Sequence, residues 1–205
     1  RQRPEKLRRD CHRFISVTSS DVLRHFSHML RSSARDNIDL LQQGIALLDS
    51  VTPDQYGAVI AVCFGSSVGG HFRHVVEHYE EFLRGLETGH IDYEARQRDL
   101  AVEGDAGVAR ARLISLVNAL ETLSVVPNRS LKVKVETAPP GTAEPWMESS
   151  LLRELEMLLG HTVHHYALIA ITCRLLGYET DADFGMAPST LRHRQAQTRL
   201  IACAR

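Results

Sequence analysis

The sequence contains no long apolar run and no strong excess of charge of either sign. Its 205 residues include 24 lysines and arginines against 25 aspartates and glutamates, which leaves a formal net charge of -1. Nonspecific binding to nucleic acid depends on a strong basic excess, so this balance argues against a nucleic-acid partner. A membrane-spanning helix needs about 20 consecutive apolar residues. Because the sequence has no such run, we also expect no membrane partner.

Cysteine is scarce as well. The sequence has four scattered cysteines that form no Cys-x-x-Cys pair: Cys11, Cys63, Cys173 and Cys203. This spacing gives little support for a disulfide framework or for a zinc site made of cysteines alone. The basic segment at the start of the sequence is not followed by the apolar stretch that a secretory signal needs. We therefore expect a protein of the reducing cytoplasm.

Four segments carry apolar residues at helical spacing. They cover residues 35–50, residues 66–89, residues 106–124 and a last stretch that begins at 145–150 and ends near 176. In the second segment the apolar residues are spaced four, three, four, three and four apart. Ser66 or Ser67 can cap the start of that helix, and Gly89 can cap its end. Four long helices of this kind predict an all-α protein, a four-helix bundle.

The connection before the last helix is long, at roughly 25 residues, which favours a crossover over a simple hairpin between helices. Within it, residues 131–136 alternate apolar and charged side chains, a pattern typical of a short strand. We therefore expect a crossover that contains a short strand or hairpin. The length suits one domain. We expect residues 35–190 to form the bundle, residues 1–34 an N-terminal arm or short helix, and residues 191–205 a C-terminal tail.

Histidine is unusually frequent in this chain, with 11 copies. On the last predicted helix, His161 and His165 are four apart and therefore lie on one face, one turn from each other. On the second helix, His71, His74 and His78 follow the spacing i, i+3, i+7 along one edge of the apolar face. Neutral imidazole is the commonest protein metal ligand, and three histidines with an open position are typical of catalytic zinc sites.

Spacing alone does not decide between a metal site and ordinary packed histidines. A pair of histidines four apart more often lies on the surface or in the core with its hydrogen bonds satisfied. The two clusters together bring the odds of metal binding to about one to one. Helical geometry also places His71 and His78 nearer the centre of the apolar face than His74. The residue of the second helix that would complete the site therefore stays open at this point.

The chain resembles the DinB/YfiT superfamily of metal-binding four-helix bundles over about residues 35–190. Five segments carry the resemblance: His71-Phe-Arg-His74, Asp92-Tyr93-x-x-Arg96-x-Arg98-Asp99, Arg153-Glu154-Leu155, His161-x-x-His164-His165-Tyr166-Ala167-Leu168-Ile169 and Phe184-Gly185-Met186-Ala187-Pro188-Ser189-Thr190. The first segment also resembles the His-Leu-x-His motif of ergothioneine sulfoxide synthases, whose second histidine is a metal ligand.

The resemblance implies a divalent metal bound by one histidine of the second helix and two of the last. Matched by position, these are His74, His161 and His165. Imidazole ligands suit zinc, which is the default, and also nickel or iron. Three further histidines are then candidates for orienting a ligand or accepting a proton near neutral pH, although packing or surface roles are about equally supported: His71, His78 and His164.

The resemblance also implies a reaction. Some members are thiol S-transferases that use low-molecular-weight thiols such as mycothiol or bacillithiol, in which the metal would bind the thiol as thiolate and deliver it to an electrophile. The resemblance therefore suggests a metal-dependent transferase acting on a small-molecule substrate. A non-catalytic metal-binding or stress-related protein is the alternative, because many members have no assigned reaction, and a plain helical interaction protein is a third. Bundles with exposed apolar stripes often pair, so we expect a homodimer.

Three residues near these segments are candidates for substrate binding: Arg73, Tyr166 and Trp146. A guanidinium pairs bidentately with a carboxylate, a tyrosine hydroxyl can donate a hydrogen bond, and a tryptophan at the mouth of the last helix can wall a pocket. Arg96 and Arg98 offer the same guanidinium chemistry. For these arginines we favour, about two to one, a solvated salt-bridge network with the neighbouring carboxylates of Asp92, Glu94 and Asp99.

Overall fold

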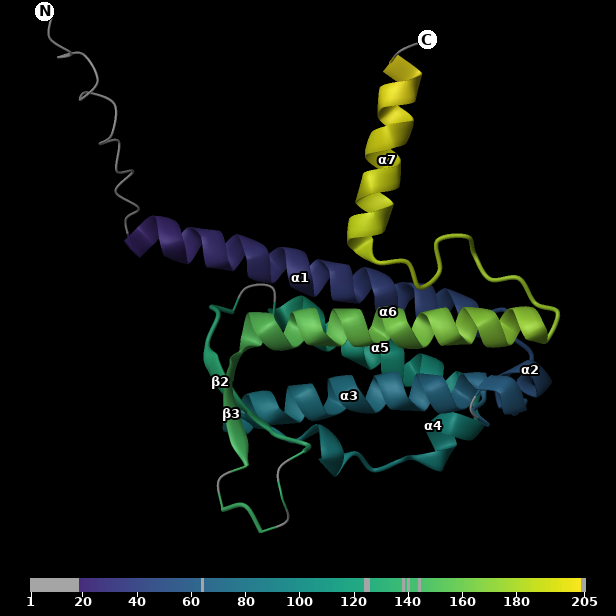
Figure 1. Cartoon of the computed structure of the whole chain (residues 1–205), viewed down its shortest axis with the longest axis horizontal. Helices are drawn as coiled ribbons and strands as arrows, with labels where there is room; N and C mark the ends of the chain where they lie inside the picture. The colour runs from purple at the N-terminus through teal and green to yellow at the C-terminus, as the bar shows by residue number, and fades with distance from the viewer. Residues whose placement is uncertain are drawn as a thin grey trace, which may run out of the picture.

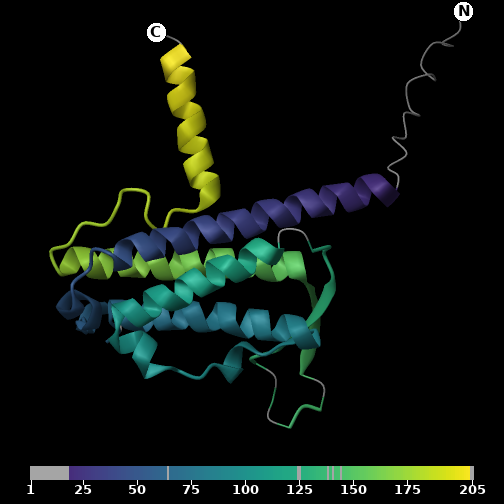
Figure 2. The same ribbon diagram turned by 180° about the vertical axis from the view of Figure 1, so that it is seen from behind.

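The computed structural model describes residues 19–203 except residues 64, 124, 125, 138, 140 and 144. Four long helices lie together, and a fifth projects away from them (Figures 1 and 2). They are α1 (Ser19–Leu48), α3 (Val68–Thr88), α5 (Ala106–Leu123), α6 (Leu151–Leu175) and the projecting α7 (Pro188–Cys203). The short elements are α2 (Pro53–Gly57), α4 (Leu100–Gly104), 3-10 turns over Ala61–Cys63 and Tyr93–Ala95, and strands β1 (His90–Ile91), β2 (Ser130–Lys134) and β3 (Trp146–Ser150).

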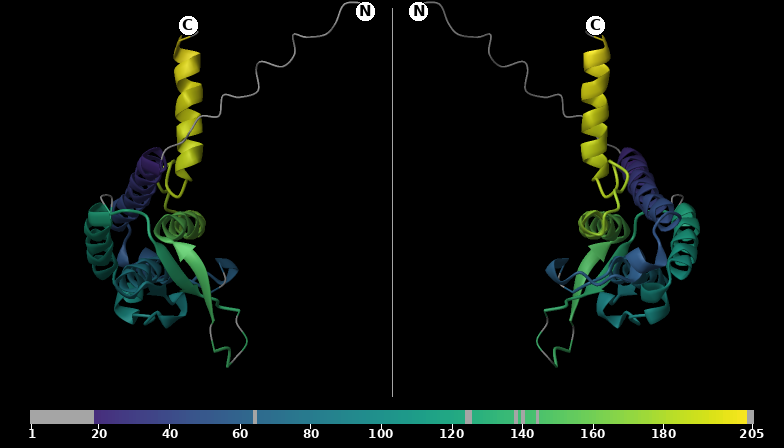
Figure 3. Two further views of the ribbon diagram at one scale, coloured as in Figure 1. Left: turned by 90° about the vertical axis from the view of Figure 1, so that its left-hand side faces the viewer. Right: turned by 90° about the vertical axis from the view of Figure 1, so that its right-hand side faces the viewer.

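Each of the four long helices that lie together packs against two of the others. Helix α1 packs against α5 and α6, and α3 packs against the same pair, so α1 and α3 lie diagonally opposite (Figure 3). Helices α5 and α6 are the other diagonal, and the chain between them passes through β2 and β3. The crossover expected before the last helix is therefore confirmed. Among the described residues, no helix combines the length and apolar character needed to cross a membrane.

Helix α3 forms as its sequence predicts. The Ser67 side chain accepts a hydrogen bond from the backbone N–H of Gly70, which satisfies one of the free donors at the helix start. Gly89 ends the helix with φ of 79°, a left-handed conformation that glycine adopts without strain. The six apolar residues of the predicted stripe are all buried in the core: Val68, Phe72, Val75, Tyr79, Phe82 and Leu86.

Helix α1 is longer than the sequence pattern suggested. It begins at Ser19 rather than residue 35, and it buries Leu30 and Ala34 completely. The physical reason is that helical apolar spacing continues from Leu30 through Ala34 and Ile38, with no proline or glycine before Gly44 to stop the helix. Part of the segment expected to lie outside the bundle therefore belongs to a helix that contributes Leu30 and Ala34 to the core.

The expected arm and tail lie only partly within the described residues. Residues 1–18 of the expected N-terminal arm, including Cys11, and residues 204 and 205 of the expected tail lie outside the described residues. The rest of the expected tail forms α7, whose described side chains are almost all exposed. Arg192 of α7 forms an ion pair with Asp36 of α1, with 3.1 Å between Nη1 and Oδ2.

A small mixed sheet closes one end of the helices. Strand β2 confirms the strand expected near residues 131–136 and pairs antiparallel with β3, with Lys132 opposite Glu148, to form the expected hairpin. Strand β1 pairs with β2 in parallel, with His90 opposite Lys132. Because β1, β2 and β3 form this sheet, the chain is mostly helical with a small sheet rather than purely α-helical.

Tyr166 belongs to the core rather than to a substrate site. Its side chain is completely buried and stacks on Phe184, with ring centroids 4.7 Å apart, while Phe72 lies on another side. Its hydroxyl has no hydrogen-bond partner and lies against Gly44 of α1. The close approach of α1 and α6 therefore depends on the missing side chain of Gly44.

We predict opposite effects for two glycine-to-alanine substitutions within helices. In Gly44→Ala the new methyl group overlaps the buried Tyr166 ring, so the free energy of unfolding should fall by about 1–3 kcal/mol. In Gly160→Ala nothing lies within 4 Å of the added carbon, and helix propensity should raise stability by up to about 1 kcal/mol. Urea unfolding followed by circular dichroism measures both. Equal stability of the two variants would contradict this packing.

Candidate metal centre

Three of the predicted histidines converge between two helices. His74 comes from α3, His161 and His165 come from α6, and one ring nitrogen of each lies within 4.8 Å of the others. His74 Nε2 and His161 Nε2 are 3.1 Å apart. Two imidazole nitrogens bound to one tetrahedral zinc at about 2.0–2.1 Å would lie roughly 3.3–3.4 Å apart. The His74–His161 pair is therefore close to the separation that a shared cation requires, and the three side chains together could hold a metal ion.

The histidines of α3 divide according to their burial. His71 and His78 are each 7% exposed, in agreement with their expected places near the centre of the apolar face. His74 is less buried and lies at the edge of that face, where α3 borders α6. It is this edge position that brings His74 to the ring of His161. The most buried histidines of α3 are thus not the ones that complete the three-nitrogen group.

His71 contacts one of the three histidines directly. Its Nδ1 lies 3.1 Å from Nδ1 of His165, while its Nε2 is buried without a hydrogen-bond partner. If Nδ1–H of His165 donates to His71, the Nε2 atom of His165 is left for a cation. Metal-binding histidines ordinarily donate their second N–H in this way, which fixes the ring orientation. His71 is therefore positioned to orient His165.

His78 uses both of its ring nitrogens. Its Nδ1 donates to the backbone carbonyl oxygen of His74 over 2.7 Å, so its Nε2 is an acceptor, 2.8 Å from Nη1 of Arg96. The Tyr93 ring stacks on the other side, with centroids 5.5 Å apart. Because both nitrogens are engaged, His78 supports the site rather than offering a free base. His164, by contrast, is exposed and places its ring 5.2 Å from that of His165.

Arg96 is a site residue that sequence reasoning set aside. One pair of the expected salt-bridge network forms, Arg96 with Glu94 at 3.4 Å, whereas Asp92 pairs with Lys134 and Asp99 pairs with Arg112. Arg96 turns inward instead, with its side chain 12% exposed and its Nη1 3.5 Å from Nδ1 of His74. The motif around Arg96 was the feature of the sequence that could have pointed to this residue. The direction of the Arg96 side chain, however, depends on how the segment after β1 folds back along α3.

The other candidate residues have their side-chain contacts outside the three histidines, although the charge of Arg73 helps to lower the pKa of His74. Arg73 is bound to Glu103 in a close ion pair, and its Nε atom is buried without a partner. Trp146 begins β3 and packs edge-on against His90, with ring centroids 5.0 Å apart. Within the described part of the chain, no ring contact links Trp146 to the histidine group. Arg98 is exposed and adopts a left-handed backbone conformation with φ of 54°.

A buried polar group holds α3 and α6 in register behind the histidines. The Tyr79 hydroxyl donates to Oδ1 of Asn37 over 2.6 Å and lies 3.1 Å from Oγ1 of Thr162. The amide of Asn37, in α1, also donates to a backbone carbonyl of α6. All three side chains are completely buried. Tyr79 and Thr162 directly follow His78 and His161, so this group fixes the rotation of both histidine-bearing helices.

Burial, reinforced by neighbouring positive charge, keeps the histidines neutral. Removal from water lowers the pKa of His74 and of His161 to about 4, with Arg96 contributing to both. Burial lowers the pKa of His78 to about 3 and that of His165 to about 2, in each case with help from His161. At neutral pH these side chains are therefore in the unprotonated form that binds a metal.

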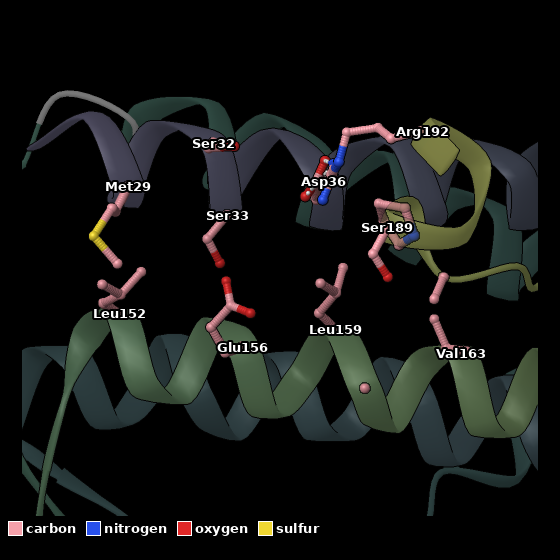
Figure 4. A pocket seen from close by; sticks show the side chains of 13 residues that line it. Met29, Ser32, Ser33, Asp36, Leu152, Glu156, Leu159, Val163, Ser189 and Arg192 are labelled. Carbon is pink, nitrogen blue, oxygen red and sulfur yellow. Dashed lines mark hydrogen bonds and ion pairs between the residues drawn. The ribbon is translucent and has the colours of Figure 1, made fainter. Parts of the chain in front are cut away.

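A large cavity lies on the opposite face of α6. It has a volume of about 590 Å³ and opens between α1 and α6, beside the start of α7. Figure 4 shows Glu156 and Leu159 of α6 facing Ser33 and Asp36 of α1 across it. None of its lining residues is a histidine. This cavity is therefore separate from the candidate metal centre.

Comparisons with known proteins do not show a family for this chain. No family model matches the sequence, and no solved structure matches it. A curated relative, FK506-binding protein 5 of Rhizopus delemar, is 32% identical over 108 residues. The match covers 52% of this chain but only 28% of the relative. Because so little of that protein is matched, its name does not indicate the activity of this chain.

We predict that the metal-free protein loses stability as the pH falls below about 6.5. The unfolded histidines take up protons there, whereas the folded ones resist protonation, so acid favours unfolding. Between pH 7.5 and pH 5.5, the free energy of unfolding should drop by about 2–4 kcal/mol, on the order of 1 kcal/mol for each such histidine. Urea unfolding in the presence of EDTA measures this difference. A His78→Gln variant should show a shallower decline, and a pH-independent stability in the wild type would contradict the burial argument.

Proposed function

We propose that the protein binds one divalent metal ion through His74, His161 and His165. The observation that carries this proposal is the convergence of one nitrogen from each residue within 4.8 Å, from two helices far apart in the sequence. The neutral state of the rings and the contact of His71 with His165 support it further. Zinc is the proposed metal, with nickel or iron as the other ions that imidazole ligands suit.

We propose further that the chain is a member of the DinB/YfiT superfamily. Support comes from four long helices around one core, a crossover before the last of them, and histidines on the second and fourth of these helices. The finer description as a four-helix bundle of this superfamily is part of the proposal. So are the cytoplasmic location and the homodimer. The projecting α7, in which Leu200 is 72% exposed, supports the dimer, because an isolated helix of this length is marginally stable.

Within that superfamily, a thiol S-transferase is the reaction we propose. A cation held by three neutral imidazoles keeps coordination positions open and lowers the pKa of a water or thiol that binds there. In the transfer, the thiol sulfur bonds to an electrophilic carbon, the leaving group departs with its electron pair, and the thiol proton passes to a base. His164 is the proposed base, because it is exposed beside His165 while the nitrogens of His78 are engaged.

A second candidate is a metal-binding or stress-related protein without a reaction of its own. One observation favours it: the large cavity lies on the face of α6 that is turned away from the histidines. Under this alternative, the cation would stabilise the contact between α3 and α6. The two candidates share the metal centre and differ only in turnover.

We predict that purified, untagged protein contains about one divalent ion per chain. His161→Ala and His165→Ala should each lose most of it, because two nitrogens hold a cation far more weakly than three. His164→Ala is the matched control, since it removes a neighbouring exposed histidine from the same helix. Elemental analysis by mass spectrometry gives the content. Full metal content in His161→Ala would exclude the proposed ligand set.

We predict turnover of a chlorinated aromatic electrophile with at least one bacterial low-molecular-weight thiol. The rate should fall at least 100-fold on removal of the metal and about 10-fold or more in His164→Ala, since a positioned base contributes on the order of 10²–10⁴-fold. Loss of absorbance of the free thiol and release of chloride measure the reaction. If metal-loaded protein turns over no thiol of the panel, the transferase proposal is excluded and the non-catalytic metal-binding protein is the candidate that stands.

A further inference from the structure

Arg96 presents a guanidinium to the candidate metal centre. Its Nη1 donates to Nε2 of His78 over 2.8 Å and lies 3.5 Å from Nδ1 of His74. Only 12% of the side chain is exposed. Arginine stays charged under all physiological conditions, so this is a fixed positive charge beside the three histidines.

The segment that carries Arg96 is held at both ends. At one end, Asp92 binds the ammonium group of Lys134 in β2, with 2.6 Å between Oδ2 and Nζ. At the other end, the backbone N–H of Asp99 donates to Oε1 of Glu77, a buried carboxylate of α3, over 2.6 Å. The inward direction of Arg96 is therefore set by the fold rather than by a loose surface loop.

The charge of Arg96 is poorly balanced within the described residues. The carboxylate within ion-pair distance is Glu94, 3.4 Å away and 42% exposed. The buried carboxylates nearby have other partners: Glu77 accepts from Asp99, and Glu154 accepts from Tyr93 and Ser149. Three neutral imidazoles supply no negative charge, so a bound divalent cation would add to the positive excess. Such a site favours an anionic ligand, because charges removed from water need a partner.

A cavity next to these residues has room for the rest of a small ligand. Its volume is about 230 Å³. Its lining includes Tyr93 and Met157 and the carboxylates of Glu148 and Glu154, but neither Arg96 nor any of the three histidines. Tyr93 stacks on His78, and Met157 lies one helical turn before His161 on α6. Arg153 also lines the cavity, but its side chain is 61% exposed.

We propose that Arg96 binds a carboxylate of the ligand, so that the centre selects small thiols that carry a carboxylate group. The inference rests on the proposed metal centre and names the class of its ligand. The planar fork of arginine suits a carboxylate, which would replace the long contact with Glu94. The thiol end of the same molecule would face the three histidines.

The test compares two thiols on protein loaded with Co²⁺. The probes are 3-mercaptopropionate and its uncharged amide, 3-mercaptopropanamide, which differ only at the carboxylate. The absorption band produced when sulfur binds cobalt gives the dissociation constant of each. Wild-type protein should bind the carboxylate thiol about tenfold or more tightly than the amide, as a charge-assisted hydrogen bond provides. Arg96→Gln should reduce this ratio to about one and leave the affinity for the amide within about twofold.

Two variants serve as controls. Arg153→Gln removes an exposed arginine of the same cavity and should keep the full preference for the carboxylate thiol. Arg96→Lys keeps the charge but not the fork, and should keep part of the preference, which gives a reading even if Arg96→Gln does not fold. Loss of the preference in Arg153→Gln but not in the Arg96 variants would overturn the assignment to Arg96.

The cobalt experiment distinguishes a missing carboxylate site from a missing metal centre. If cobalt-loaded wild-type protein binds both thiols equally, the carboxylate site is overturned while the metal centre stands. If the wild-type protein binds no cobalt, the metal centre is overturned, and the ligand class falls with it. Retention of the preference by Arg96→Gln would also overturn the inference.

Discussion

The contact between α3 and α6 is the constraint on which the site depends. The buried hydrogen bonds among Asn37, Tyr79 and Thr162 set the rotation of these helices, so the histidines that directly precede Tyr79 and Thr162 face fixed directions. An unpaired polar group in this core would cost about 1–3 kcal/mol, so alternative registers of α3 against α6 are disfavoured. In the observed register, Nε2 of His74 and Nε2 of His161 lie 3.1 Å apart.

The histidine group is a costly arrangement without a cation. Five imidazole rings and one guanidinium share a small space between α3, α6 and the segment after β1. Nitrogens of His71 and His161 are buried without partners, which is the kind of exception to full hydrogen bonding that marks functional sites. Stability elsewhere, in the apolar core, supports this locally unfavourable group.

Features that depend on residues close together in the sequence were predicted correctly, whereas features that depend on distant residues were not. The start of α3 at Ser67, its end at Gly89 and its buried stripe depend on neighbouring residues, and they agree with the structure. The start of α1 was misplaced because its apolar spacing is weak before Leu30. The described side chains just before Leu30 are exposed or half-buried, whereas Leu30 and Ala34 are buried in the core. Strand β1 was missed because two residues carry no readable period, and pairing with β2 creates the strand.

The sequence by itself determined the helices and the histidine-rich faces, because helical periodicity and capping act within a few residues. The resemblance of its motifs then singled out His74, which spacing alone did not favour over His71 or His78. Only the tertiary structure decided that His74 meets His161, that Tyr166 fills the core beside Gly44, and that Arg96 points inward. These outcomes depend on which helices are neighbours and on how a loop folds back over them. Such long-range contacts are set by the packing of the whole core, so no local pattern contains them.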